Sequence, residues 1–127
     1  MRTKRSVGRQ GELLAASILE AHGIRTCHVD IEGDDLWAKT PSNVFYPVQV
    51  KSASCAILQS PHHTIPKYNF TVRGNIGYTG LFMLVALDVR FAIIRLGTTV
   101  TGPSIKVKKE LFTETTEKLS ITEAFEL

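Results

Sequence analysis

The feature that most constrains the fold is one clear helix pattern, residues 7–22, which precedes a long series of strand-like segments. In this segment, VGRQGELLAASILEAH, apolar residues recur with helical spacing between Leu14 and Leu19. Ser6 is a suitable N-cap, and Gly23 occupies the position at which a glycine commonly ends a helix. The sequence therefore predicts an amphipathic helix at this end of the chain.

The rest of the chain has mostly strand patterns. These patterns cover 24–31, 35–39, 44–53, 68–73, 81–88, 90–96 and 105–109, and a second short helix is expected over 120–127. Residues 54–66, which hold a His-His-Thr sequence between two prolines, are expected to form a loop. A helix followed by closely connected strands favours a mixed α/β domain with a largely antiparallel sheet.

The 127 residues are enough for one domain with a core, and we expect a single domain over 1–127. The most apolar run, 81–94, is interrupted by charged residues, so no membrane span is expected. The basic N-terminus lacks the apolar segment of a secretory signal. Cys27 and Cys55 form neither a disulfide framework nor a metal-binding pattern. We therefore expect a cytoplasmic protein with reduced thiols and no membrane partner.

The net charge of +3 is modest, but the basic residues are unevenly placed. Four of them precede the first acid of the chain: Arg2, Lys4, Arg5 and Arg9. Residues 1–7 are expected to form a basic, flexible arm that contacts phosphates. A solvated tail without a partner explains the same pattern equally well. The lysines of 105–109 leave a similar choice, because they either extend a phosphate-binding surface or protect a sheet edge from aggregation.

Glu12 lies close to the apolar stripe of the predicted helix. It falls within about 20° of Leu19, because seven residues make nearly two helical turns. An acid on the border of a core needs a partner. Alternatively, Glu12 reaches back to water or complements the helix dipole.

The segments 35–39 and 44–53 are expected to form a hairpin around a turn at Pro41–Asn43. In that register Leu36 lies opposite Val48 on a core face, and Asp35 lies opposite Gln49 on the other face. Directly opposed Cβ atoms are about 5 Å apart, so both polar side chains can reach one ion. A slip of one residue would separate them.

Lys51 follows Gln49 on the same strand face and completes an arrangement suited to phosphodiester hydrolysis. Mg²⁺ takes oxygen ligands, which Asp35 and Gln49 supply. A metal polarises a phosphate and lowers the pKa of bound water, and a neighbouring lysine orients that water or offsets negative charge. A surface acid beside a lysine that extends to solvent is the alternative explanation.

Three short motifs in the order helix, strand, strand resemble the PD-(D/E)xK nuclease superfamily. They are GRQGE at 8–12, GDDL at 33–36 and VQVKS at 48–52. The likeness is greatest to group I intron-encoded homing endonucleases of this type and their phage and bacterial relatives, in which Gln can replace the third acid. Archaeal Holliday-junction resolvases are more distantly similar. The resemblance covers about residues 8–52 and implies a restriction-endonuclease-like core, with the N-terminal helix packed on a central mixed sheet.

The resemblance also implies a set of metal ligands. Asp35 would be the bridging ligand rather than Asp34, because the acid of the family usually precedes an apolar residue. Gln49 would occupy the second acidic position and bind through its side-chain oxygen. The backbone carbonyl of Val50 would be a further ligand, and Glu12 would hold the metal or a metal-bound water.

Lys51 would be the catalytic lysine that orients water, and Ser52 would join the N-terminal basic residues in contacting DNA. The implied activity is that of a Mg²⁺-dependent endodeoxyribonuclease, with Mn²⁺ as a substitute, acting as a homodimer or larger homo-oligomer. Gln49 removes one negative charge, so the metal should bind more weakly. Three alternatives remain open: a catalytically impaired DNA-binding or assembly protein, a structure-selective junction resolvase, and a small nucleotide- or RNA-directed enzyme.

Other polar residues near these motifs receive simpler interpretations. The alternation of His28, Asp30 and Glu32 is typical of a solvated outer strand face. Trp37 is expected to pack beside the Asp35 site. Many relatives have a second core helix after the Gln-x-Lys strand, where this sequence predicts a loop and a strand.

Overall fold

The structure is a computed structural model that describes residues 3–127. Its first helix, α1, spans Lys4–Ala21, and the side chain of Thr3 caps it by accepting the backbone N–H of Ser6 at 3.1 Å. The helix therefore begins earlier than predicted, and residues 4–7 form its first turn instead of a flexible arm. Threonine and serine are both good caps, so the sequence alone does not decide between them. Arg2 lies outside the described residues.

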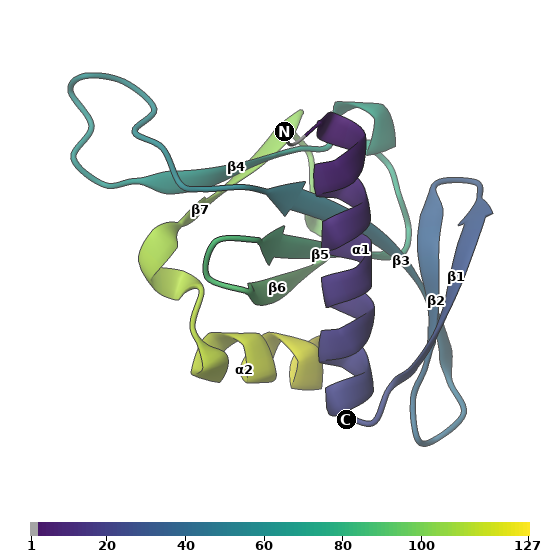
Figure 1. The fold of residues 1–127 in the computed structure, drawn as a ribbon. Helices are drawn as coiled ribbons and strands as arrows, with labels where there is room; N and C mark the ends of the chain where they lie inside the picture. The colour runs from purple at the N-terminus through teal and green to yellow at the C-terminus, as the bar shows by residue number, and fades with distance from the viewer. Residues whose placement is uncertain (1–2) are drawn as a thin grey trace.

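The main sheet has five strands in the order β1-β2-β3-β5-β6 (Figure 1). Their bounds are β1 Arg25–Ile31, β2 Asp34–Lys39, β3 Phe45–Ala53, β5 Leu81–Ala86 and β6 Phe91–Leu96. β3 and β5 run parallel at the centre, and the other neighbours are antiparallel. The prediction of a mixed, largely antiparallel sheet behind an N-terminal helix is confirmed.

A separate antiparallel ribbon of two strands, β4 (Lys67–Thr71) and β7 (Ser104–Lys108), lies beside the main sheet (Figure 1). β4 follows the loop after β3, as the sequence predicts. The C-terminal helix α2 spans Glu114–Ala124, and the side chain of Thr113 caps it, so it begins well before the predicted start at 120. Across residues 3–127 no helix is long and apolar enough to cross a membrane.

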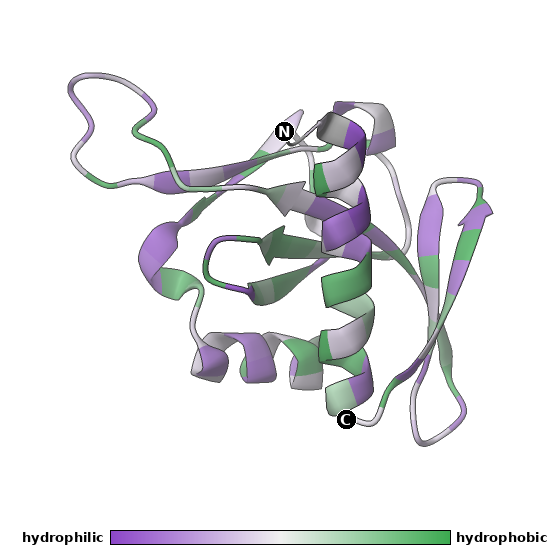
Figure 2. Ribbon diagram, in the orientation of Figure 1, coloured by the Kyte–Doolittle hydropathy of each residue, from purple (hydrophilic) through white to green (hydrophobic). Residues whose placement is uncertain are grey.

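Both faces of the main sheet are covered. α1 and α2 pack on one face, where the core includes Leu19, Val48, Met83, Ile94 and Ile121. The β4–β7 ribbon packs on the opposite face, where the core includes Tyr68, Phe70, Phe82, Leu84 and Ile93. Every residue of β5 is buried, and Figure 2 shows this strand as strongly hydrophobic. The predicted core face of the hairpin, with Leu36 and Val48, packs under the helices, and the ribbon covers part of the other face.

Helix α2 closes the outer edge of the sheet with its side chains. The carboxylate of Glu117 accepts the N–H of Ala92 at 2.8 Å, and Ser120 Oγ accepts the N–H of Ile94 at 3.2 Å. Both donors belong to β6, which is the last strand in the order of the main sheet. Burial raises the pKa of Glu117, and the hydrogen bond from Ala92 acts in the opposite direction.

Candidate active site

The close approach of α1 to β3 depends on Gly11. A Cβ atom at this position would collide with the side chain of Ser52, and the Ser52 hydroxyl is buried without a hydrogen-bond partner. The contact brings the next helix residue, Glu12, over the middle of β3. It also buries the Ser52 hydroxyl between helix and strand, while Ser52 lines the same hollow as Gln49 and Lys51, so its contact with DNA stays a prediction.

The predicted register between β2 and β3 is confirmed. Leu36 pairs with Val48 and Lys39 with Phe45. The connecting turn at 41–43 ends with Asn43 at a φ of 66°, and the backbone closes between Thr40 and Val44. Asparagine tolerates this left-handed conformation better than most residues. The turn therefore fixes the register on which the site depends.

Asp35 lies just beyond the last paired residues of the β2–β3 ladder. Its Oδ2 accepts the backbone N–H of Val50 at 2.8 Å and the side-chain amide of Gln49 at 3.0 Å. Both bonds come from β3, so they aim the carboxylate at this strand. Burial raises the pKa of Asp35, while the Val50 N–H and the charge of Lys51 act in the opposite direction.

The Gln49 side chain has an unsatisfied oxygen in a buried position. The residue is 9% exposed, and its Oε1 has no hydrogen-bond partner. A half-turn of the terminal amide would exchange Oε1 and Nε2 and replace the hydrogen bond from Nε2 to Asp35. After that turn, Oε1 lies beside the Asp35 carboxylate, as two ligands of one hard cation would. The residues therefore fit a Mg²⁺ ion.

The donor set is nonetheless sparse. Within residues 3–127, no three His, Cys, Asp or Glu side chains are grouped so that they could hold a metal ion. A cation here would depend on Asp35, the Gln49 amide, the adjacent carbonyl of Val50, and oxygens from water or phosphate. This agrees with the weaker metal binding expected from a glutamine in place of an acid.

Asp34 has a different environment from its neighbour Asp35. The hydroxyl of Tyr78 donates to its Oδ1 at 2.7 Å, and the indole N–H of Trp37 donates to its Oδ2 at 2.9 Å. Burial and the bond to Asp34 raise the pKa of Tyr78, so the hydroxyl keeps its proton and remains a donor. Asp35 is therefore the carboxylate available to a ligand, and Trp37 binds Asp34 rather than lining the Asp35 site.

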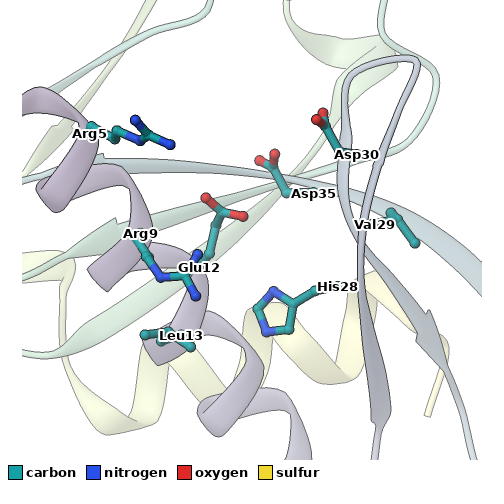
Figure 3. Close-up of a pocket in the computed structure, with 8 residues that line it drawn as sticks. All are labelled: Arg5, Arg9, Glu12, Leu13, His28, Val29, Asp30 and Asp35. Atoms are coloured by element: carbon teal, nitrogen blue, oxygen red, sulfur yellow. The ribbon is translucent and has the colours of Figure 1, made fainter.

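A cleft of about 750 Å³ lies between α1 and the β1–β2 hairpin (Figure 3). Its lining residues are Arg5, Arg9, Glu12, Leu13, His28, Val29, Asp30 and Asp35. Glu12 and Asp35 extend into it from α1 and β2. Burial and the negative charge of Asp35 raise the pKa of Glu12, while His28 and Arg9 act in the opposite direction. Glu12 therefore lies near a second carboxylate, and a cation shared by the two would relieve their repulsion.

His28 and Asp30 are exposed, as predicted for a solvated strand face, and both also line this cleft (Figure 3). The β1–β2 ladder shifts register between His28 and Ile31, so Val29 and Asp30 share one opposite position at Asp35. Such bulges redirect side chains and are frequent beside active sites. Strand alternation placed His28 and Asp30 on one face, but it gave no sign that this face borders Glu12 and Asp35.

The turn that joins β1 and β2 explains why Glu32 does not belong to the same face. Glu32 and Gly33 have φ values of 51° and 87°. Positive values at both positions are typical of the two-residue type I′ hairpin turn. Glu32 is therefore a turn residue, and the Glu-Gly pair between two strand patterns was the signal in the sequence.

The four predicted catalytic residues line one hollow of about 780 Å³, which adjoins the first cleft. These residues are Glu12, Asp35, Gln49 and Lys51. Burial lowers the pKa of Lys51, and the nearby Asp35 carboxylate partly offsets that effect. Arg5 and Arg9 lie one helical turn apart at the rim of the first cleft, and both are exposed (Figure 3).

With a helix packed over a mixed five-stranded sheet, the chain has a restriction-endonuclease-like fold. The solved structure of a bacterial homing endonuclease, I-Ssp6803I, matches it with a TM-score of 0.67 and 16% sequence identity. The match covers 84% of this chain and 76% of the other. No family model and no curated protein matches the sequence.

Proposed function

We propose that the protein is a Mg²⁺-dependent endodeoxyribonuclease that hydrolyses backbone phosphodiester bonds. The observation that carries this proposal is the meeting of Glu12, Asp35, Gln49 and Lys51 in one hollow. The likeness to a homing endonuclease supports DNA as the substrate. Mn²⁺ should substitute for Mg²⁺, because both take oxygen ligands.

Each side chain has a distinct role in this proposal. Asp35, Gln49 Oε1 and the Val50 carbonyl would hold the cation, which supplies Lewis-acid polarisation of the phosphate and a more acidic bound water. Lys51 orients the attacking water and offsets charge that develops on the phosphate. Glu12 faces the same space from α1 and accepts a hydrogen bond from that water.

Arg5 and Arg9 are placed to contact the DNA backbone at the rim of the cleft. If both neutralise phosphates, changing them to Ala should reduce the slope of log affinity against log salt by about 0.9 per residue. An unchanged slope would remove them from the interface. Cutting both strands of a duplex requires two sites, so we expect a homodimer or larger assembly on DNA.

Cleavage of supercoiled plasmid and of a four-way junction tests the proposal. Wild type should cut at least one of them in Mg²⁺ or Mn²⁺ and neither in EDTA. Lys51→Ala should abolish cutting, and Lys118→Ala, on the exposed surface of α2, should leave it intact. Metal-independent cutting, or cutting by Lys51→Ala at the wild-type rate, contradicts the proposed site.

The same experiment separates the competing functions. Salt-sensitive DNA binding without cutting of any target in a randomised library would indicate a non-catalytic DNA-binding protein. Preferential cutting of the junction would indicate a structure-selective resolvase. Stronger competition by RNA than by DNA would indicate an RNA-directed enzyme.

A further inference from the structure

The outward face of the β4–β7 ribbon is polar and basic. Side chains alternate along both strands, so Tyr68, Phe70 and Val107 are buried against the main sheet. The outward residues are Lys67, Asn69, Thr71, Ser104, Lys106 and Lys108. Neither strand contains an acid, so the lysines have no opposite charge on their own ribbon.

The pairing within the ribbon places like charges together. Lys67 lies directly opposite Lys108, and Asn69 lies directly opposite Lys106. Like charges at directly opposed positions destabilise a strand pair. An anionic partner would relieve this repulsion.

The ribbon borders the proposed active site. Asn69 and Thr71 line the same hollow as Asp35 and Lys51. Thr3, at the start of α1, also lines this hollow, and Figure 1 shows that end of the helix near the ribbon. The basic face thus continues from the place where a scissile phosphate would bind.

We infer that the outward face of β4–β7 is a DNA-binding surface that lies in the major groove beside the cleavage site. This inference rests on the proposed function and extends it. The major groove admits a two-stranded β-ribbon, and asparagine pairs with the edge of adenine there. Lys106 and Lys108 contact phosphates, and Asn69 faces the bases next to the scissile bond.

Salt-dependent binding to a labelled mixed-sequence DNA duplex, measured with Ca²⁺ in place of Mg²⁺, tests the lysines. Lys106→Gln and Lys108→Gln should each lower the slope of log affinity against log salt by about 0.9, and the double variant by about twice as much. Lys118→Gln removes the same charge from exposed α2 and should leave both affinity and slope unchanged. Thermal unfolding of each variant shows whether the fold is intact.

Asn69→Ala tests base recognition separately. It should leave the salt slope unchanged and relax the preference at about one base position in a randomised target library. A variant library profile identical to that of wild type would overturn the role of Asn69.

The outcomes separate this inference from the proposed function. If wild type cuts DNA and the double lysine variant binds with the wild-type slope, the ribbon is not in the interface and its lysines serve as edge protection. If wild type binds through the ribbon lysines but cuts no target, the inference holds and the nuclease proposal fails. If wild type binds no duplex, both fail.

Discussion

The first two residues of β2, Asp34 and Asp35, lie on two sides of the strand and carry the same carboxylate group in different surroundings. On one side, both oxygens of Asp34 accept hydrogen bonds, from Tyr78 and Trp37. On the other side, Asp35 accepts hydrogen bonds at Oδ2 alone, from Gln49 and Val50, and lies near a lysine whose pKa burial lowers. A fully satisfied polar cluster rigidifies a fold, whereas a partly satisfied one is the expected condition of a binding site.

The largest expected effect is on cleavage, and it comes from the side of β2 that carries Asp35. Asp35→Asn and Lys51→Ala should each reduce single-turnover cleavage by about 100-fold or more, because each removes a charge that acts at the reacting phosphate. Calorimetry should also detect no Mg²⁺ binding to Asp35→Asn. If these variants cleave within a factor of a few of the wild-type rate, Asp35 and Lys51 are not required for cleavage, and the two sides of β2 do not differ in function.

Substitution of Gly11 tests how closely α1 must approach β3 for the protein to be stable. Gly11→Ala should lower the free energy of unfolding by about 1–3 kcal/mol, because its methyl group overlaps Ser52. Adding Ser52→Gly should restore much of the loss, since it removes the colliding side chain. Urea unfolding of the two single variants and the double variant measures this coupling, and additive effects would show that the collision is not the cause.

A change on the Asp34 side should affect the stability of the protein more than its cleavage activity. Tyr78→Phe leaves Asp34 without one donor and should lower the free energy of unfolding by about 1–3 kcal/mol. The cleavage rate at a temperature where the variant is folded should change far less than in Lys51→Ala. The contrast between the two sides is wrong if Tyr78→Phe loses activity while keeping its stability.

Glu117 provides a smaller test in another buried carboxylate that accepts a backbone hydrogen bond. Burial raises its pKa in the native state, with His22 opposing and Glu114 adding to the shift. The native state then holds this proton more tightly than the unfolded state does. Its contribution to the free energy of unfolding therefore falls as pH rises through the window above the ordinary glutamate value of about 4.3.

Glu117→Gln keeps an acceptor for Ala92 and removes the titration. The difference in the free energy of unfolding, variant minus wild type, should increase with pH across that window. Urea unfolding at several pH values measures it. A difference that does not change with pH would show that this carboxyl does not titrate differently in the two states.

The parts of the site that could be predicted depend on short-range patterns. Alternation in 35–39 and 44–53, together with one turn, was enough to place Asp35 beside Gln49, and helical periodicity placed Glu12 near the core. No short-range pattern predicts the hydrogen bond between Asp34 and Tyr78, because the two residues are far apart in the chain and meet only after the main sheet forms. Alternation placed His28 and Asp30 on one strand face, but nothing in the sequence showed that this face borders the cleft.

The closed edge at β6 has a consequence for how the chain folds. The two groups that cover this edge, on Glu117 and Ser120, follow the strand by a long stretch of sequence. During folding, the two N–H groups of β6 stay open until α2 docks, so partly folded chains can pair with one another. A fragment that stops before Glu114 would remain in that condition and should aggregate. In the full chain a second copy cannot extend the sheet at β6, so the homo-oligomer that we propose must form through another surface.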